Sequence, residues 1–282
     1  MYKIVKKETL NEQVKLMEIE APLIAKKAQP GQFIIFRIAE GGERVPLTIS
    51  DYDREKGNVT IVFQEVGKTT KELGTLEAGD SLLDFVGPLG RASELEGYKK
   101  VAVIGGGLGT AIAYPQAKEL KRLGTEVHSI IGFRNKELII LEDKVRAASD
   151  KTFVMTDDGS NGHQGFVTNA LKEQIENGEK YDLVIAIGPL IMMKMVCNLT
   201  KEYGIKTIVS MNPIMIDGTG MCGGCRVTVG GETKFACVDG PDFDGHLVDF
   251  DGAMRRQGMY KKQEQESMKK HECRLFGGEA NA

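Results

Sequence analysis

The chain has 282 residues, of which 41% are hydrophobic, and its formal net charge at pH 7 is −3. This length allows two compact domains and a smaller third segment. The slightly negative charge gives no indication of a nucleic-acid partner, and no apolar run approaches the ~20 residues of a membrane-spanning helix. Because the N-terminus also lacks the apolar stretch of a signal peptide, we expect a cytoplasmic protein that binds neither nucleic acid nor membrane.

Residues 1–97 are expected to form a small antiparallel β-barrel. Apolar and polar residues alternate in several short segments, as in 32–38, and turn-forming residues such as Gln29-Pro30-Gly31 separate the segments. The expected strands are 2–8, 12–20, 31–38, 45–50, 57–65 and 80–86. Short strands with no convincing helix between them favour a barrel.

Residues 98–211 carry the pattern of an α/β domain. Short apolar runs, of which Lys100 to Ile104 is the first, alternate with segments of helical periodicity. The expected strands are 100–104, 126–131, 152–155, 183–187 and 207–210. Pro115 is expected to mark the start of the first helix, since proline suits the first helical position. This alternation favours βαβ units and a doubly wound parallel sheet.

Residues 212–282 are rich in glycine and cysteine as far as Gly240, and from about residue 250 they read as a polar helical tail. The chain has an odd number of cysteines, which argues against a disulfide framework; they are Cys197, Cys222, Cys225, Cys237 and Cys273. Cys197 falls in an apolar helical segment and is expected to be a core residue. The clustering of three of the others predicts a metal site.

The spacing of these residues resembles that of a plant-type [2Fe–2S] site, C-x₄-C-x₂-C…C. The four candidate ligands are Asp217, Cys222, Cys225 and Cys237, with Asp217 where the first cysteine would stand. Other interpretations stay open: three thiolates and a carboxylate can bind zinc, Cys222 and Cys225 could form a redox pair, and Cys237 could simply be buried. Asp217 could be only a turn residue before glycine; as a ligand it would be a hard oxygen donor that shifts the cluster potential.

Loops rich in glycine or aspartate follow three of the expected parallel strands. They consist of Gly105, Gly106, Gly107, Gly109 and Thr110, then Asp157, Asp158 and Gly159, then Gly188 and Pro189. Ligands of open α/β sheets bind at the carboxyl ends of the strands, so these loops predict a nucleotide site. The match is imperfect, because Thr110 stands where the dinucleotide fingerprint has its third glycine. Alternatively, the glycines serve close packing and the aspartates cap turns.

The order of barrel, nucleotide domain and cysteine-rich segment resembles the ferredoxin-reductase-like flavoprotein superfamily. Within it, the chain looks most like the small subunits of electron-bifurcating NADH-dependent reduced ferredoxin:NADP⁺ oxidoreductases. The resemblance covers nearly the whole chain and is most specific over 211–250, where Asp217 precedes the three cysteines. The electron-transfer subunits of dihydroorotate dehydrogenase, which have four cysteines there, and sulfide dehydrogenase subunits are near relatives.

The resemblance implies FAD in the barrel, NAD(H) at the glycine-rich loops and a [2Fe–2S] cluster on Asp217 and the three cysteines. The FAD would be held by Arg44, Pro46, Leu47 and Thr48, together with Phe63, Gln64, Glu65, Gly67, Thr69 and Thr70. NAD(H) would lie on Gly105 to Thr110, Asp157 to Gly159 and Gly188-Pro189. Arg134 and Lys136 follow the second parallel strand and could accept the 2′-phosphate of NADP, so the choice of nucleotide stays open.

The activity implied is hydride exchange between NAD(H) and FAD, and single-electron exchange between FAD and the cluster. The cofactors perform this chemistry, so no protein residue is nominated as catalytic. The implied heterodimer partner is a larger flavin and [4Fe–4S] subunit that bifurcates electrons from NADPH and reaches ferredoxin, with the tail 250–282 packing on it. The alternatives are a dihydroorotate or sulfide dehydrogenase subunit, and a zinc-stabilised nucleotide-binding regulatory module without redox turnover.

Overall fold

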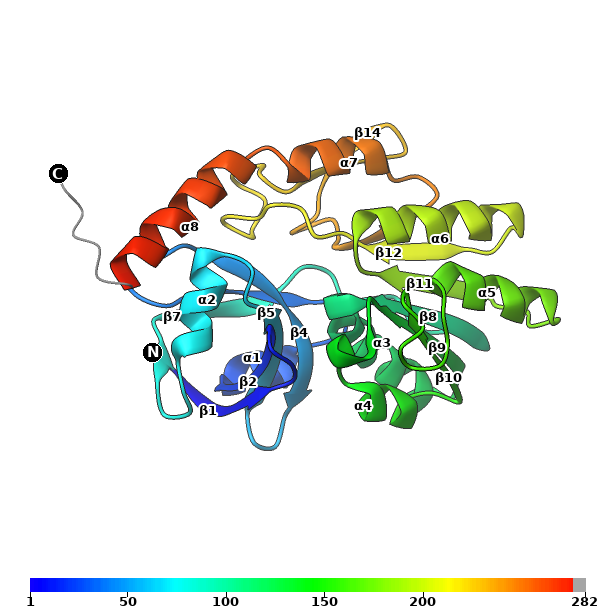
Figure 1. Ribbon diagram of the computed structural model, residues 1–282, viewed down its shortest axis with the longest axis horizontal. Coiled ribbons are helices and arrows are strands. Elements are labelled where there is room, and N and C mark those ends of the chain that lie inside the picture. Colours follow the sequence, from blue (N-terminus) through cyan, green and yellow to red (C-terminus); the bar gives the residue numbers. More distant parts are fainter. Residues whose placement is uncertain (276–282) are drawn as a thin grey trace.

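The computed structural model describes residues 1–275, and the side chains of residues 1–269. The barrel and the α/β layer lie beside each other, and the cysteine-rich segment with helices α7 and α8 lies across both (Figure 1). Within the described part of the chain, no helix combines the length and the apolar character needed to cross a bilayer.

The N-terminal part forms a nearly closed antiparallel sheet in the order β6-β1-β2-β5-β4-β3-β7, as the sequence predicts. Its strands are β1 (Tyr2–Thr9), β2 (Val14–Glu20), β3 (Phe33–Arg37), β4 (Val45–Asp53), β5 (Asn58–Gln64), β6 (Ser81–Leu82) and β7 (Asp84–Leu89). Aromatic side chains such as Phe36, Phe63 and Phe85 fill the interior. Their burial on the inward face explains the alternation seen in the sequence.

Two helices in this part correct the expectation of a barrel without helices. They are α1 (Pro22–Lys27) and α2 (Lys68–Thr75). Each is too short to show a clear 3.6-residue periodicity. Their start signals are a proline in the first turn of α1 and Gly67 at the N-cap of α2.

The second sheet has the order β10-β9-β8-β11-β12-β15, and its first five strands run parallel. The strands are β8 (Lys100–Gly106), β9 (Glu126–Phe133), β10 (Lys151–Thr156), β11 (Leu183–Ile187), β12 (Thr207–Ser210) and β15 (Asp242–Asp244). Helices α3 (Thr110–Arg122) and α4 (Glu142–Ala147) cover one face, and α5 (Val167–Glu176) and α6 (Leu190–Glu202) the other. The doubly wound sheet is therefore confirmed; the antiparallel strand β15, from the cysteine-rich segment, was not foreseen.

Helix α3 starts earlier than the sequence predicts, so the expectation that Pro115 opens it is wrong. The 3₁₀ turn η1 (Gly107–Gly109) leads directly into Thr110, and Pro115 lies inside the helix. Proline has no N–H to donate to the Ala111 carbonyl. That carbonyl instead accepts a 2.7 Å hydrogen bond from the buried Ser50 hydroxyl of β4. A barrel residue thus compensates for the proline and ties the barrel to α3.

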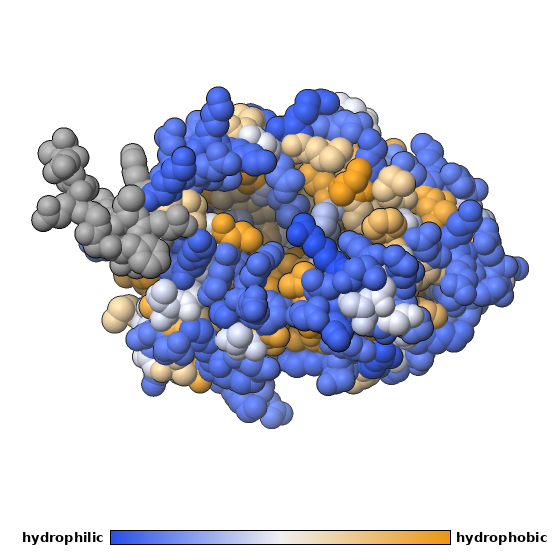
Figure 2. All heavy atoms as spheres, viewed as in Figure 1, coloured by the Kyte–Doolittle hydropathy of each residue, from blue (hydrophilic) through white to orange (hydrophobic). Residues whose placement is uncertain are grey.

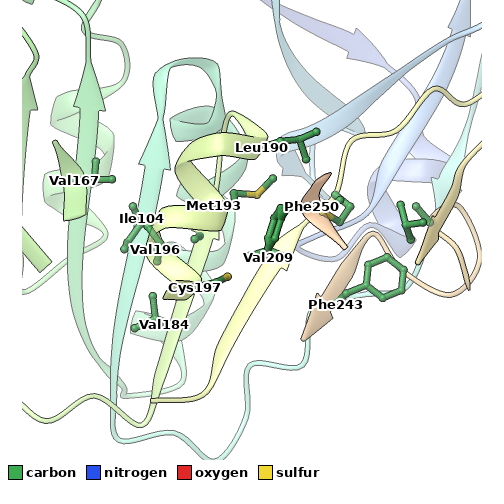
Figure 3. Close-up of a cluster of buried hydrophobic side chains, with 14 of the residues drawn as sticks. Ile104, Val167, Val184, Leu190, Met193, Val196, Cys197, Val209, Phe243 and Phe250 are labelled. Atoms are coloured by element: carbon green, nitrogen blue, oxygen red, sulfur yellow. The ribbon is translucent and has the colours of Figure 1, made fainter. Parts of the chain in front are cut away.

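A continuous hydrophobic core joins the three parts of the molecule. Figure 3 shows α6 side chains, among them Met193, packed over Val209 of β12, with Phe243 and Phe250 of the C-terminal segment nearby. The same core includes Ile35 of the barrel and the buried thiols of Cys197, Cys225 and Cys237. Cys197 is therefore a core residue, as predicted.

The cysteine-rich segment contains a small hairpin and ends in two helices. The elements are β13 (Arg226–Val229), β14 (Glu232–Phe235), α7 (Phe250–Gln257) and α8 (Lys261–Leu275). Helix α8 contacts α2 of the barrel, and below α7 and α8 the surface is hollowed, with hydrophobic residues inside (Figure 2). The side chain of Cys273 and residues 276–282 lie outside the described part, and packing of this tail on a partner stays a prediction.

Candidate functional site

The hairpin β13–β14 brings two of the three candidate cysteine ligands together. Cys225 stands just before β13 and Cys237 shortly after β14, and their Sγ atoms lie 3.2 Å apart. Both are 2% exposed, whereas Cys222 is exposed. Burial, as the main cause, and the hydrogen bond from Cys225, as the second, raise the pKa of the Cys237 thiol to about 12. A metal that binds here would displace the protons of the thiols.

Asp217 lies in the loop that leads to Cys222, and its carboxylate is held by hydrogen bonds. It accepts from the Cys222 N–H at 2.6 Å, and from the backbone N–H and hydroxyl of Thr219 at 2.5 and 2.7 Å. Hydrogen bonds, first from the Cys222 side chain and then from Thr219, hold the pKa of the Asp217 carboxyl well below its usual range. Asp217 is thus both a turn residue and an ionised oxygen donor adjacent to Cys222.

The four candidate ligands lie in two contacting pairs: the Asp217 carboxylate contacts the N–H and the side chain of Cys222, and the Cys225 thiol contacts the Cys237 thiol. A mononuclear zinc site would gather all its ligand atoms around one tetrahedral ion. In the described part of the chain, only Glu126, His128 and Glu179 bring three such atoms within 4.8 Å of one another. Two separate pairs fit a two-iron cluster better than one zinc ion, because each pair can bind one iron.

The glycine-rich loops meet where the strand order of the parallel sheet reverses. Strands β8 and β11 are neighbours, and Gly109 approaches the end of β11 so closely that an added Cβ would collide with the Ile187 carbonyl oxygen. A Cβ on Gly188 would lie 3.1 Å from the Gly106 Cα. The Thr110 hydroxyl is fully buried and has no hydrogen-bond partner. The close contacts of Gly109 and Gly188 fit the interpretation that these glycines serve packing, whereas the unpaired hydroxyl at the switch point fits a nucleotide phosphate.

The other candidate nucleotide residues flank this point. Asp158 accepts a 2.9 Å hydrogen bond from the Ser160 N–H, and bonds from Ser160 lower the pKa of its carboxyl, as in a capped turn. Pro189 is the N-cap of α6. Arg134 lies in the loop after β9 and Asp157 in the loop after β10, and both are exposed. All these residues stand at the carboxyl edge of the parallel sheet.

The candidate flavin residues of the barrel fall into two groups. Pro46, Leu47 and Thr48 are half-buried on β4. Gly67 is the N-cap of α2, and the N–H of Gly67 donates to the Thr70 hydroxyl at 3.0 Å. The Thr69 hydroxyl in the first turn donates to the Glu43 carboxylate. A carboxylate therefore lies at the α2 N-terminus, where the N–H groups of the first turn favour an anion.

The remaining three candidates lie near these groups. Phe63 is fully buried in the barrel core. Gln64 donates to the Gln13 side chain at 2.8 Å, and Glu65 packs against Gly74 of α2. Only the backbone of Phe63 is therefore available for binding a ligand, since its side chain is needed for packing.

Two contacts at the cysteine loop were missed by the sequence analysis. Arg44 Nε donates to the Ile216 carbonyl at 3.1 Å, and Arg256 of α7 donates to the Gly224 carbonyl at 3.2 Å. Arg44 and Ile216 are 172 residues apart in the sequence. No local pattern could have indicated either contact, because both depend on how the three parts pack.

Residues 212–249 match the family described as the iron–sulfur cluster binding domain of dihydroorotate dehydrogenase B. A Clostridium beijerinckii protein named for its place in the adh 3′ region is 57% identical, covering 94% of this chain and 92% of its own length. A Thermotoga maritima homologue of the dihydroorotate dehydrogenase B electron transfer subunit is 47% identical, covering 93% of this chain and 92% of its own length. The Fusobacterium nucleatum electron transfer subunit of that enzyme is 33% identical, covering 80% of this chain and 88% of its own length.

A solved structure of an NADH-dependent reduced ferredoxin-NADP oxidoreductase, studied for flavin-based electron bifurcation, is similar throughout. It is 46% identical with a TM-score of 0.91, over 96% of this chain and 97% of that chain. The Amycolatopsis cytochrome P450 reductase is 19% identical with a TM-score of 0.60, over 71% and 65%, which shows a shared fold alone. The expected resemblance is therefore confirmed.

Proposed function

We propose that this chain is an electron-transfer subunit of a flavin- and iron–sulfur-dependent oxidoreductase. The premise is that the chain belongs to the family of dihydroorotate dehydrogenase B electron-transfer subunits and their homologues. In this proposal, FAD binds at β4 and the α2 N-terminus, a [2Fe–2S] cluster binds at Asp217, Cys222, Cys225 and Cys237, and NAD(H) binds at the carboxyl edge of the parallel sheet. The domain limits are those given above: 1–97, 98–211 and 212–282.

The observation that carries the proposal is the adjacency of the cysteine loop and β4. Arg44, next to the first residue of β4, donates to the carbonyls of Ile216 and, at 3.4 Å, of Asp217. On the other side, β4 reaches α3 through Ser50, and α3 follows the glycine-rich loop. One strand therefore connects the candidate cluster, flavin and nucleotide sites.

When bound, the flavin would exchange a hydride with the nicotinamide and single electrons with the cluster. The residues of the chain hold and orient these groups. The N–H groups at the α2 N-terminus and Arg44 suit the charge of a pyrophosphate, and the buried Thr110 hydroxyl suits a nucleotide phosphate. The two pairs of candidate ligands, at the ends of the hairpin β13–β14 and in the loop before it, would hold the irons beside the barrel.

The particular enzyme we propose is an electron-bifurcating NADH-dependent ferredoxin:NADP⁺ oxidoreductase, in which a larger flavin and [4Fe–4S] subunit is the partner and ferredoxin is reached through the complex. The support is the likeness of the whole chain to a structure of that name, together with Asp217 in place of a cysteine. NAD(H) is proposed for this subunit. Exposed Arg134 and Lys136 keep NADP(H) as the alternative to be measured.

The names of the relatives favour a second candidate, the electron-transfer subunit of a dihydroorotate dehydrogenase. Anaerobic purification of the native complex separates the two, because the co-purifying subunit identifies the substrates with which this chain exchanges electrons. The first proposal expects a partner carrying flavin and [4Fe–4S], and NADPH-dependent reduction of ferredoxin together with NAD⁺. A partner that reduces NAD⁺ with dihydroorotate, and is inactive with ferredoxin, would contradict it.

A further inference from the structure

The loop that carries Asp217 is fitted closely onto the barrel. Gly218 is buried with φ +78°, and a Cβ added there would lie 2.5 Å from Ile35 Cδ1 and 3.0 Å from Leu89 Cδ1. Strand β3 and the end of β7 therefore touch the loop backbone directly. A shift of this loop would change the distance between the cluster site and the barrel.

Arg44 fastens the same loop by hydrogen bonds. Its Nε donates to the Ile216 carbonyl at 3.1 Å and an Nη2 hydrogen to the Asp217 carbonyl at 3.4 Å. A guanidinium has five N–H donors in one plane, so three remain for another acceptor. Arg44 can thus bind the loop and an anionic group of the flavin at the same time. A lysine ammonium keeps the charge but lacks this planar set of N–H donors.

We propose that Arg44 is a positioning residue that couples flavin binding to the cluster loop, so that each group is held more tightly when the other is bound. This rests on the proposed function. The coupling must be reciprocal: a flavin that orients Arg44 also orders the carbonyls of Ile216 and Asp217, and an ordered loop presents Arg44 to the flavin. The role is additional to any direct contact between Arg44 and FAD.

The test uses the full-length wild-type chain and Arg44→Lys, each with FAD bound and after FAD depletion. The electron paramagnetic resonance spectrum of the reduced cluster should change on FAD depletion in the wild type and stay the same in R44K. In a second measurement, removing the cluster with a chelator should weaken FAD binding roughly tenfold in the wild type, within the usual range of coupling. In R44K the same treatment should leave the FAD affinity unchanged.

Arg54→Lys is the matched control. Arg54 also belongs to the barrel, but its Nη2 donates to the Ala28 carbonyl and its guanidinium lies over the Tyr52 ring, away from the cysteine loop. R54K should retain both wild-type dependences. The inference is overturned if wild type and R44K respond equally to depletion of either group. Wild-type protein purified without iron and flavin would overturn the proposed function itself, and this inference with it.

Discussion

At Asp217, one carboxylate combines a turn function with the proposed ligand function. The hydrogen bonds from Thr219 and Cys222 shape the loop, and they hold the ionised carboxylate beside Cys222. Aspartate before glycine is common in turns, which is why the sequence pattern left its role open. Removing the charge while keeping an acceptor oxygen separates the two functions.

Asp217→Asn should alter the cluster while it spares most of the turn. The amide oxygen in the Oδ1 position can still accept both hydrogen bonds from Thr219, but an amide is a weaker iron ligand than a carboxylate. We expect a lower iron content, or a changed spectrum and reduction potential, in D217N. Thr219→Val is the control, because it removes only the 2.7 Å hydroxyl contact to Asp217. A wild-type spectrum and potential in D217N would show that Asp217 is no ligand.

At the scale of single residues, spacing predicted the cysteine cluster and the glycine loops, because ligand geometry and backbone approach act over a few positions. The flavin residues came only from the resemblance. The contacts of Arg44 and Arg256 could not be predicted, because their acceptors are backbone carbonyls that any sequence possesses. The carboxylate of Glu43 at the α2 N-terminus was missed because its partner, the Thr69 hydroxyl, lies 26 residues away in the chain.

Among the elements, the junction between β4 and α3 illustrates how a local rule can be overridden. Pro115 was expected to begin the helix, yet the helix extends five residues further towards its N-terminus, because Ser50 satisfies the carbonyl that proline leaves unpaired. Similarly, α1 and α2 escaped prediction because they are short. Long strands buried on both faces, such as β8 and β11, were predictable from their apolar runs.

Ser50→Ala should destabilise the chain, since it leaves the buried Ala111 carbonyl without its donor. The expected loss in free energy of unfolding is about 1–3 kcal/mol. In a Pro115→Ala background, the new N–H of residue 115 can donate to that carbonyl, so S50A should cost about 1 kcal/mol less there. Urea unfolding of the four proteins measures this difference. Equal costs of S50A in both backgrounds would contradict the account.

The amino edge of the parallel sheet carries an ion-pair network centred on Glu179. Its carboxylate lies 2.6 Å from Nζ of both Lys100 and Lys151. The hydrogen bond from Lys100, and after it the one from Lys151, lowers the pKa of Glu179 to about 2. The pKa of glutamate in an unfolded chain is about 4.3. The stabilisation from this network is therefore present above that pH and is lost as the pH falls from about 4.3 towards 2.

Glu179→Gln should reduce the free energy of unfolding at pH 7 by up to about 1 kcal/mol, a surface-pair magnitude. The difference from wild type should shrink as the pH falls below about 4 and vanish only below about pH 2, where the wild-type carboxyl becomes protonated in the folded state as well. Denaturant unfolding across this pH range measures it. Glu176→Gln, in an exposed pair with Lys172 at 3.7 Å, is the control. A difference that persisted unchanged to pH 2 would refute this explanation.

For the whole molecule, the parts predicted separately from the sequence form one body around a shared core. Ile35 of the barrel, Val209 of the α/β sheet and Phe243 of the cysteine-rich segment belong to the same cluster. The order of the parts along the chain gave the fold class, but their mutual placement depends on tertiary contacts such as β15 on β12 and α8 on α2. It is this placement that brings the candidate cluster loop against Arg44, next to the candidate flavin strand β4.

The measurement that tests the account most directly is the metal, sulfide and flavin content of the anaerobically purified full chain, read together with its visible spectrum. We predict about two irons and two sulfides per FAD, with flavin and iron–sulfur absorption in the visible range. Zinc in a colourless protein without flavin would contradict the central claim, and would leave a nucleotide-binding regulatory module as the interpretation of the same fold.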